Sequence, residues 1–178
     1  MPLAETHGAM PLIYVSRHGD LHRTFQLLQD LAIGEPISPT AFSLSVHNAT
    51  AGLFSIQQGL TKNITAISCS EAELIPALLE ALGQCKTQEP RVMCVFCDEP
   101  PPDIYRAHVN QPEFPYALAL IVSLGDTWQL TNLGSLNNAT STPSKLQPMG
   151  LLALLQGETR NLSIVHNHTN WQLSRSDQ

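Results

Sequence analysis

The stretch with the clearest capacity for chemistry is a sharp turn at Cys69, Ser70 and Glu71. An apolar segment, 64–69, precedes the turn and a leucine-rich segment follows it, so we predict a strand, a turn and a helix. Such a turn aims one side chain at a substrate and offers the backbone N–H groups of a helix start to negative charge. The residue at this turn therefore decides whether the chain is an enzyme.

A second candidate is the triplet Arg17-His18-Gly19, directly after the apolar run 11–15. It resembles the motif of the histidine phosphatases, in which the histidine accepts a phosphoryl group and the arginine binds phosphate. His166, which follows a late apolar run, would be the second histidine of such a site. The further phosphate-binding arginine of that family has no counterpart in a matching context. A phosphomonoesterase that uses Arg17 and His18 is therefore an alternative and not the favoured interpretation.

Two other groups have the residue types of a site but not its spacing. Asp98, Glu99 and Asp103 could bind a divalent ion or act as an acid–base pair, but the prolines between them indicate a solvated acidic loop. Cys94 and Cys97 form C-x-x-C within an expected buried strand. Strand residues three apart point to opposite faces, so these thiols cannot share one ion. We predict no metal and no cofactor.

Composition narrows the class of partner. Only 13% of the 178 residues are charged, against roughly 25% in typical soluble domains, while 43% are hydrophobic. A surface this poor in charge is either buried against a partner, which we favour, or solvated by the many Ser, Thr, Asn and Gln side chains. The net charge of −6 argues against nucleic acid and anionic membrane as ligands. With no signal peptide and no apolar run near the ~18 residues of a membrane span, we predict a cytoplasmic protein.

Alternating strand and helix patterns predict an α/β fold with a mixed sheet in one domain, 1–178. The expected strands are 11–15, 64–69, 91–96 and a hairpin of 116–123 and 128–133 over Gly125-Asp126. The segments 162–166 and 170–173 are either a final strand pair or one strand with a break. The expected helices run from Asp20 to Gly34, over 46–58, from the turn to Gly83, and over 149–156, with loops at 36–43 and 98–103.

The start of the helix after the turn is open to two interpretations. Ser70 and Glu73 match a capping box, which would begin the helix at Ser70. Pro76 would then lie inside the helix, where proline costs about 3 kcal/mol. We therefore expect a kink at Pro76 or a late start near Ile75.

A broader resemblance lies in the segment 46–60, VHNATAGLFSIQQGL. It resembles the N-terminal half of the β-ketoacyl synthases of the thiolase fold. Their pattern is a small-residue helix with N-x-x-A-G, a G-L-x-G-P loop, a strand, and then A-C-x-S-[GA] with the nucleophilic cysteine. The matching residues are Asn48, Ala51, Gly52, Gly59 and Leu60.

The longer run 14–82, with SRHGD and SPTAFSLSVHNATAG, resembles one branch of these proteins. This branch comprises the N-terminal-domain-only, ketosynthase-like proteins of aryl polyene biosynthesis, described as chain length factors. DEPPPDIY and the late strand with Trp171 fit the same branch.

The resemblance implies that the turn is a degenerate nucleophile elbow. Counting from the matched residues puts Glu71 at the position of the nucleophile, or Ser70 if the register shifts by one. Cys69 falls two positions early, on the strand. About 178 residues also leave no room for the second half, whose two histidines activate malonyl decarboxylation in the family. A non-catalytic subunit is the favoured interpretation, and a condensing enzyme that uses Cys69 is the alternative.

The resemblance also implies a partner. A catalytic β-ketoacyl-ACP synthase would pair with this chain. This chain would stabilise the synthase and shape the synthase's acyl tunnel. An acyl carrier protein would bind the synthase and not this chain. The strands before the elbow would pair across a pseudo-two-fold axis. The predicted interface residues are Ile64, Thr65, Ala66, Ile67, Ser68, Asn48 and Phe54.

Overall fold

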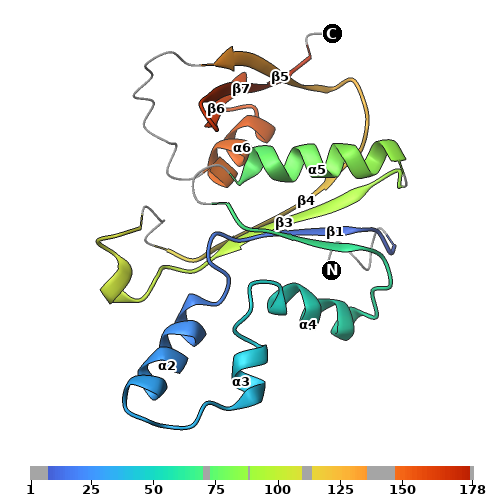
Figure 1. Cartoon of the computed structure of the whole chain (residues 1–178). Helices are drawn as coiled ribbons and strands as arrows, with labels where there is room; N and C mark the ends of the chain where they lie inside the picture. Colours follow the sequence, from blue (N-terminus) through green and yellow to red (C-terminus); the bar gives the residue numbers. More distant parts are fainter. Residues whose placement is uncertain (1–7, 70–72, 88, 110–113, 136–146, 177–178) are drawn as a thin grey trace.

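The structure is a computed structural model that describes residues 8–69, 73–87, 89–109, 114–135 and 147–176. In these parts of the chain, two β-sheets enclose a layer of two helices, α5 and α6 (Figure 1). Helix α4 covers the other face of the larger sheet, and α2 and α3 lie on the same side, farther from the strands. The predicted α/β class is confirmed, but the strands divide between two sheets.

The larger sheet is mixed, as predicted. Its strands are β1 (Leu12–Val15), β2 (Ile64–Ile67), β3 (Val92–Asp98) and β4 (Tyr116–Val122), in the order β2-β1-β3-β4. β1 runs parallel to both β2 and β3, and β4 runs antiparallel to β3. Every residue of β1 is buried because helices cover both faces of the sheet, which explains its unbroken apolar sequence.

The smaller sheet is antiparallel. It contains β5 (Trp128–Ser135), β6 (Asn161–His166) and β7 (Thr169–Arg175), in the order β5-β7-β6. β6 and β7 form a strand pair, one of the two alternatives expected for 162–173. Their two-residue turn places Asn167 and His168 at φ values of 49° and 59°. Two successive positive φ angles are the signature of a type I′ hairpin turn.

The predicted hairpin between β4 and β5 is wrong. β4 pairs with β3 in the larger sheet, whereas β5 pairs with β7 in the smaller one. Apolar side chains of both strands pack against the same helix layer, but from opposite sides. The connection through Gly125 and Asp126 therefore carries the chain from the larger sheet to the smaller one. In these positions both strands bury their apolar faces against the helix layer.

The helix layer contains α5 (Leu74–Thr87) and α6 (Gln147–Leu155). α5 begins at Leu74, so the expected late start is confirmed and Pro76 lies in the first turn, where its missing N–H costs nothing. The expected end at Gly83 is wrong, since the helix continues to Thr87. The main core unites both sheets around this layer; its buried residues include Ile13, Val15, Leu74, Ile75, Val92, Phe96, Leu151, Leu154, Ile164 and Leu173.

The outer helices are α2 (Leu21–Ala32), α3 (Pro39–Ser43) and α4 (Ala49–Gln58). Asp20 caps α2 as predicted, because its side chain accepts a hydrogen bond from the Arg23 N–H. α3 replaces part of the expected loop 36–43, with Ser38 as its cap and Pro39 at its first position. α4 begins three residues later than expected and ends at Gly59, whose φ is 61°.

Candidate functional site

Of the three residues of the predicted elbow, the structure describes only Cys69, which follows β2. β2 ends at Ile67, so Cys69 lies in the following loop and not on the strand as predicted. Ser70 and Glu71 lie outside the described residues. Burial, and then the charge of Glu73, raises the pKa of the Cys69 thiol above its usual value. Among the described residues, no hydrogen bond reaches its sulfur, so none of these residues is placed to act as the base that a nucleophile needs.

A buried polar cluster lies beside this loop, where β1, β3, β4 and α5 meet. The Arg17 Nε donates to Glu73 Oε1 at 2.6 Å, and both side chains are at least 95% buried. The Tyr116 hydroxyl donates to Asp98 Oδ2 at 3.0 Å and lies 3.4 Å from Glu73 Oε1. We call Arg17, Glu73, Asp98 and Tyr116 the Arg17 cluster. Sequence reasoning missed this cluster, because Arg17 is 81 residues from Asp98 and 56 residues from Glu73 in the chain.

Asp98 is the acceptor that joins two strand ends in this cluster. Its Oδ1 accepts from the Ser16 hydroxyl at 2.7 Å and from the Arg17 N–H at 2.9 Å. The prediction of a solvated acidic loop is therefore wrong for Asp98, which is the last residue of β3 and 7% exposed. It holds for Glu99, which is exposed, and for Asp103, which forms an exposed ion pair with Arg106.

The electrostatics of the Arg17 cluster are those of a structural pair. Burial alone would lower the pKa of the Arg17 guanidinium, but its hydrogen bond and charge interaction with Glu73 outweigh this and raise it. Burial, followed by the charges of Glu73 and Asp98, also raises the pKa of Tyr116 far above its usual range. The phenol therefore stays neutral and acts as a hydrogen-bond donor. Arg17 is committed to holding elements together.

This geometry removes the basis for a phosphatase site. The Arg17 guanidinium is buried against a carboxylate, whereas a phosphate-binding arginine must reach a ligand. His18 is exposed, and His166 lies at the end of β6 in the other sheet. The triplet has a local structural reason instead. Gly19 has a φ of 63°, and a Cβ there would approach the His47 Cα to 3.0 Å.

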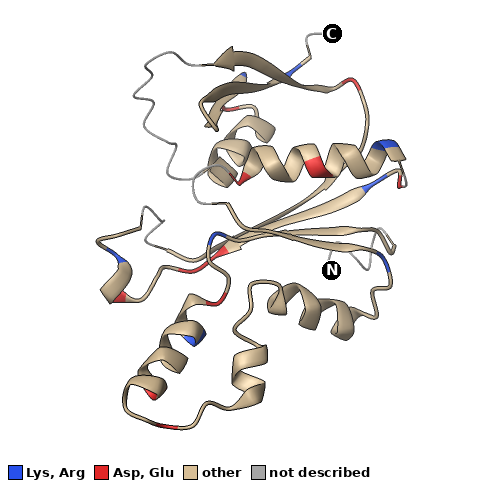
Figure 2. Cartoon of the chain, viewed as in Figure 1, with Lys and Arg blue, Asp and Glu red and all other residues tan. Residues whose placement is uncertain are grey.

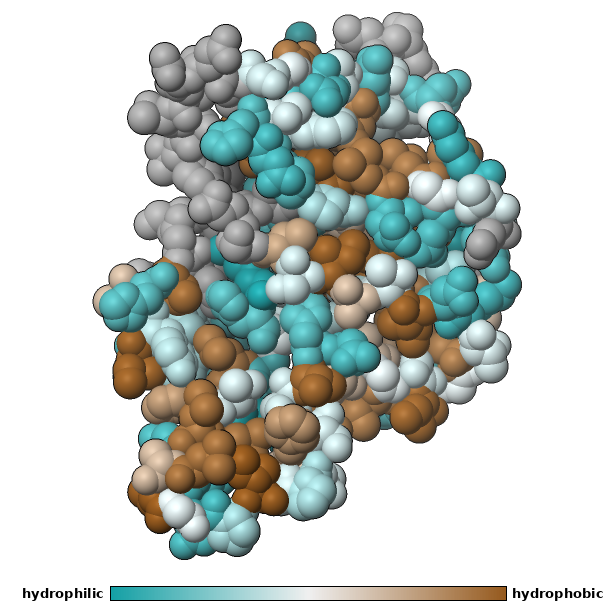
Figure 3. Space-filling model, in the orientation of Figure 1, coloured by the Kyte–Doolittle hydropathy of each residue, from teal (hydrophilic) through white to brown (hydrophobic). Residues whose placement is uncertain are grey.

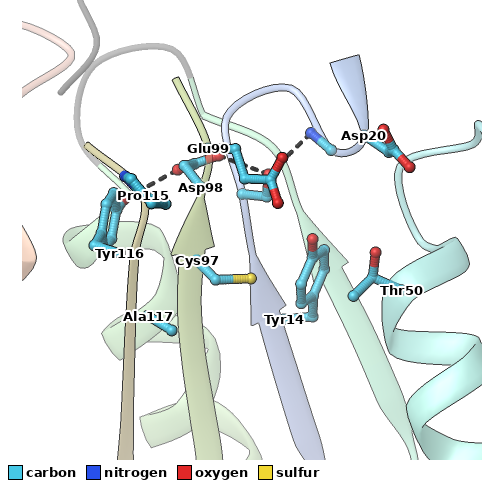
Figure 4. Close-up of a pocket in the computed structure, with 11 residues that line it drawn as sticks. Tyr14, Asp20, Thr50, Cys97, Asp98, Glu99, Pro115, Tyr116 and Ala117 are labelled. Atoms are coloured by element: carbon cyan, nitrogen blue, oxygen red, sulfur yellow. Dashed lines mark hydrogen bonds between the residues drawn. The ribbon is translucent and has the colours of Figure 1, made fainter. Parts of the chain in front are cut away.

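A pocket of about 490 Å³ opens at the carboxyl ends of β1 and β3, beside the Arg17 cluster (Figure 4). Its walls carry the Tyr14 hydroxyl, the Thr50 hydroxyl, the Cys97 thiol and the Glu99 carboxylate. Burial, and then Cys97, raises the pKa of Tyr14 to about 12. Burial also raises the pKa of Cys97. The pocket offers hydrogen-bonding groups and carboxylates, but burial opposes deprotonation of its Tyr14 phenol and its Cys97 thiol. The signal for this pocket in the sequence was that two strands end there.

The cysteines and carboxylates form no metal centre in the described residues. Cys94 lies in the main core and Cys97 packs with the residues on the opposite face of the sheet, as the strand spacing predicted. All four cysteines are free thiols. Within the described ranges, no group of three or more His, Cys, Asp and Glu side chains is placed to hold an ion.

The residues predicted to contact a partner lie on or beside β2, at one edge of the larger sheet. Ala66, Ser68 and Asn48 are exposed. Ile64 and Phe54 pack partly against the protein's own second core cluster, which includes Leu12, Tyr14 and Met93. Ile67 packs against the main core. The exposed part of the predicted interface is therefore its backbone edge and small side chains.

The family model for the β-ketoacyl synthase N-terminal domain matches residues 1–174. The chain belongs to this family. The resemblance inferred from the segment 46–60 is thereby confirmed.

A solved structure extends this family assignment. One chain of the complex of a ketosynthase (ApeO) with its chain length factor (ApeC) from Xenorhabdus doucetiae superposes with a TM-score of 0.82 at 30% identity. The match covers 97% of this chain and 72% of that chain. The fold is therefore that of the thiolase-like ketosynthases. No curated protein matches the chain. None of the described helices is long and apolar enough to cross a bilayer.

Proposed function

We propose that this chain is a non-catalytic, chain length factor-like subunit of a β-ketoacyl-ACP synthase. It would pair with a catalytic ketosynthase, stabilise it and shape its acyl tunnel, in a type II polyketide or fatty-acid-like pathway such as aryl polyene biosynthesis. The complex would work in the cytoplasm and receive its substrates from an acyl carrier protein bound to the catalytic partner.

The observation that carries this proposal is the open edge at β2. In the described part of the chain, β2 pairs only with β1, so its other side presents unpaired backbone groups. No charged residue occurs over 63–70 to protect this edge. Natural proteins protect or cover such an edge, because it otherwise pairs with other chains. A strand from a partner subunit would cover it.

Apolar side chains beyond the edge support a large interface. Leu53 and Ile56 on α4 are 53% and 80% exposed. Apolar residues also gather on the surface around α2 and α3, at the lower left of Figure 3; they are Leu28, Leu31, Ile33 and Phe42. α3 and α4 carry no Lys, Arg, Asp or Glu (Figure 2). Interfaces of permanent complexes commonly exceed about 2,000 Å² and are apolar, which suits the uncharged helices α3 and α4.

The state of Cys69 supports the non-catalytic part of the proposal. A condensing enzyme needs a cysteine that is readily deprotonated, and both burial and Glu73 oppose deprotonation of Cys69. The named roles in the ApeO–ApeC complex, a ketosynthase and its chain length factor, favour a division of labour of this kind.

The test is co-expression with a catalytic ketosynthase of an aryl polyene pathway, followed by size-exclusion chromatography. We expect a stable heteromer, and we expect the chain alone to aggregate. Ala66→Glu should abolish co-elution, because it places a charge on the exposed side chain of β2. Ala119→Glu is the matched control, since Ala119 is an exposed alanine on β4 at the opposite edge of the same sheet.

The outcomes separate this proposal from its alternatives. A well-behaved monomer that ignores the ketosynthase, or equal loss of binding in both variants, would count against the subunit. Condensation of acyl and malonyl carriers by the chain alone, lost on Cys69→Ala, would show an enzyme instead. Hydrolysis of a phosphomonoester that is lost on His18→Ala would restore the phosphatase interpretation.

A further inference from the structure

A second large pocket, of about 800 Å³, is lined by residues of the smaller sheet and of the chain around the end of α6. It opens where the smaller sheet and the C-terminal end of α6 diverge. Its lining residues include Trp128, Leu154, Arg160 and Arg175, with Asp126 at the rim. We call it the Arg160/Arg175 pocket. Small-molecule sites commonly measure about 300–1,000 Å³, so its size admits a metabolite.

The strand register brings the two arginines to the same pocket. Arg175, the last residue of β7, is opposite Trp128 of β5. On the other side of β7, Asn161 of β6 is opposite Ser174, and Arg160 directly precedes Asn161. Arg175 lies two residues after Leu173, which is buried in the main core, so its side chain leaves the sheet on the face that α6 covers. Two cations and an indole thus line one cavity.

Neither arginine has a structural task in the described part of the chain. There, Arg160 and Arg175 make no ion pair and no side-chain hydrogen bond, and both are exposed. In contrast, Arg17, Arg23, Lys62 and Arg106 are each paired with a carboxylate. Like charges close together on neighbouring strands are destabilising, so the pair suggests a ligand.

The end of α6 does not occupy them either. The backbone carbonyls of its last turn, at Leu152, Ala153 and Leu154, accept hydrogen bonds from the N–H groups of residues 156–158. These three carbonyls are therefore satisfied by the backbone of the helix end, and no described residue bonds either guanidinium group.

We infer that the Arg160/Arg175 pocket binds a small-molecule phosphate ester with an apolar portion. Guanidinium groups bind phosphate through paired, charge-assisted hydrogen bonds, and two of them match a doubly charged group. The hydroxyls of Thr127, Thr159 and Ser176 line the same cavity and can donate further bonds. Trp128 and Leu154 are the large apolar residues of its lining. This inference does not depend on the proposed pairing through β2.

The test uses the full chain, alone or in complex with its ketosynthase, and equilibrium dialysis with 1-naphthyl phosphate. We expect saturable binding at one site, with 1-naphthol and inorganic phosphate each binding more weakly. Arg160→Gln and Arg175→Gln should each weaken binding about tenfold or more, because each removes charge-assisted hydrogen bonds. Asp126→Asn should strengthen it, because the Asp126 carboxylate repels the phosphate.

Arg106→Gln is the matched control, since it removes an exposed arginine that lies outside this pocket. It should leave the affinity unchanged. Far-UV circular dichroism checks that each variant folds; if a glutamine variant does not, Arg175→Lys keeps the charge, loses the planar fork and should still weaken binding. Non-saturable binding, equal affinity for 1-naphthol, or the same loss in Arg106→Gln would overturn the inference.

Discussion

Arg17 shows how far a motif can differ from its structural role. In the sequence it belongs to a triplet that resembles a phosphate-binding site, but in the structure its guanidinium is buried against Glu73. A buried cation without a counter-charge is costly, whereas one in a hydrogen-bonded pair is tolerated. The Arg17 cluster joins the ends of β1, β3 and β4 to the start of α5. Its role is to hold the region of the elbow in shape.

The variant Glu73→Gln should lower the free energy of unfolding by about 3 kcal/mol, because it leaves the buried Arg17 charge uncompensated. Urea denaturation followed by circular dichroism measures this loss. Asp103→Asn is the control, since it makes the same change in the exposed pair with Arg106 and should change stability little. Equal, small effects of both variants would mean that Glu73 and Arg17 do not depend on each other.

Cys69 should react slowly with iodoacetamide at neutral pH. Its folded-state pKa is raised by burial and by Glu73, so the thiolate fraction is smaller than in a free cysteine, whose pKa is about 8.5. Mass spectrometry of the alkylated peptide, over a range of pH, should give a rate that rises with a midpoint above that value. The variant Cys69→Ser should lose the alkylated peptide, which shows that the labelling occurs at Cys69. Rapid labelling below pH 7 would instead indicate an activated nucleophile.

At the scale of elements, local patterns predicted the elements whose partners are near in sequence. The cap at Asp20, the late start of α5 before Pro76 and the final strand pair, one of two alternatives for 162–173, all depend on neighbouring residues. The hairpin predicted between β4 and β5 failed because turn residues report a change of direction, not the sheet that a strand joins. Long-range packing determines which side of α5 each strand covers.

The extension of α5 beyond Gly83 makes a testable difference. Gly83 is helical, and a Cβ added there would meet no atom within 4 Å. Gly83→Ala should therefore stabilise the protein by about 0.5–1 kcal/mol, measured as a shift in the urea midpoint. Gly59→Ala is the contrasting variant and should destabilise, because Gly59 ends α4 with a φ of 61°. A loss of stability in Gly83→Ala would mean that the helix ends where the sequence suggested.

At the scale of the molecule, one core joins the two sheets through α5 and α6. We therefore expect the predicted single domain, 1–178, to unfold as one cooperative unit. Both tryptophans of the chain lie in the smaller sheet, Trp128 on β5 and Trp171 on β7. Fluorescence thus reports on that sheet, whereas far-UV circular dichroism reports on all elements.

The two signals should give the same urea midpoint, and Leu154→Ala should lower both together, since Leu154 lies in the shared core. A fluorescence transition at lower urea, with the circular dichroism signal still intact, would show that the smaller sheet is a separate unit.

The sequence by itself determined the family, the mixed α/β class and most helix and strand positions. These depend on residue types at short spacing, such as the small residues around Asn48 and Gly59 or the alternation in β6. Only the tertiary structure decided which residues meet. It brought together the Arg17 cluster, placed β2 at an edge of the larger sheet as far as the chain is described, and placed Arg160 and Arg175 at one pocket. The reason is physical: burial, pairing and exposed charge depend on contacts between distant segments, and these have no local signature in the chain.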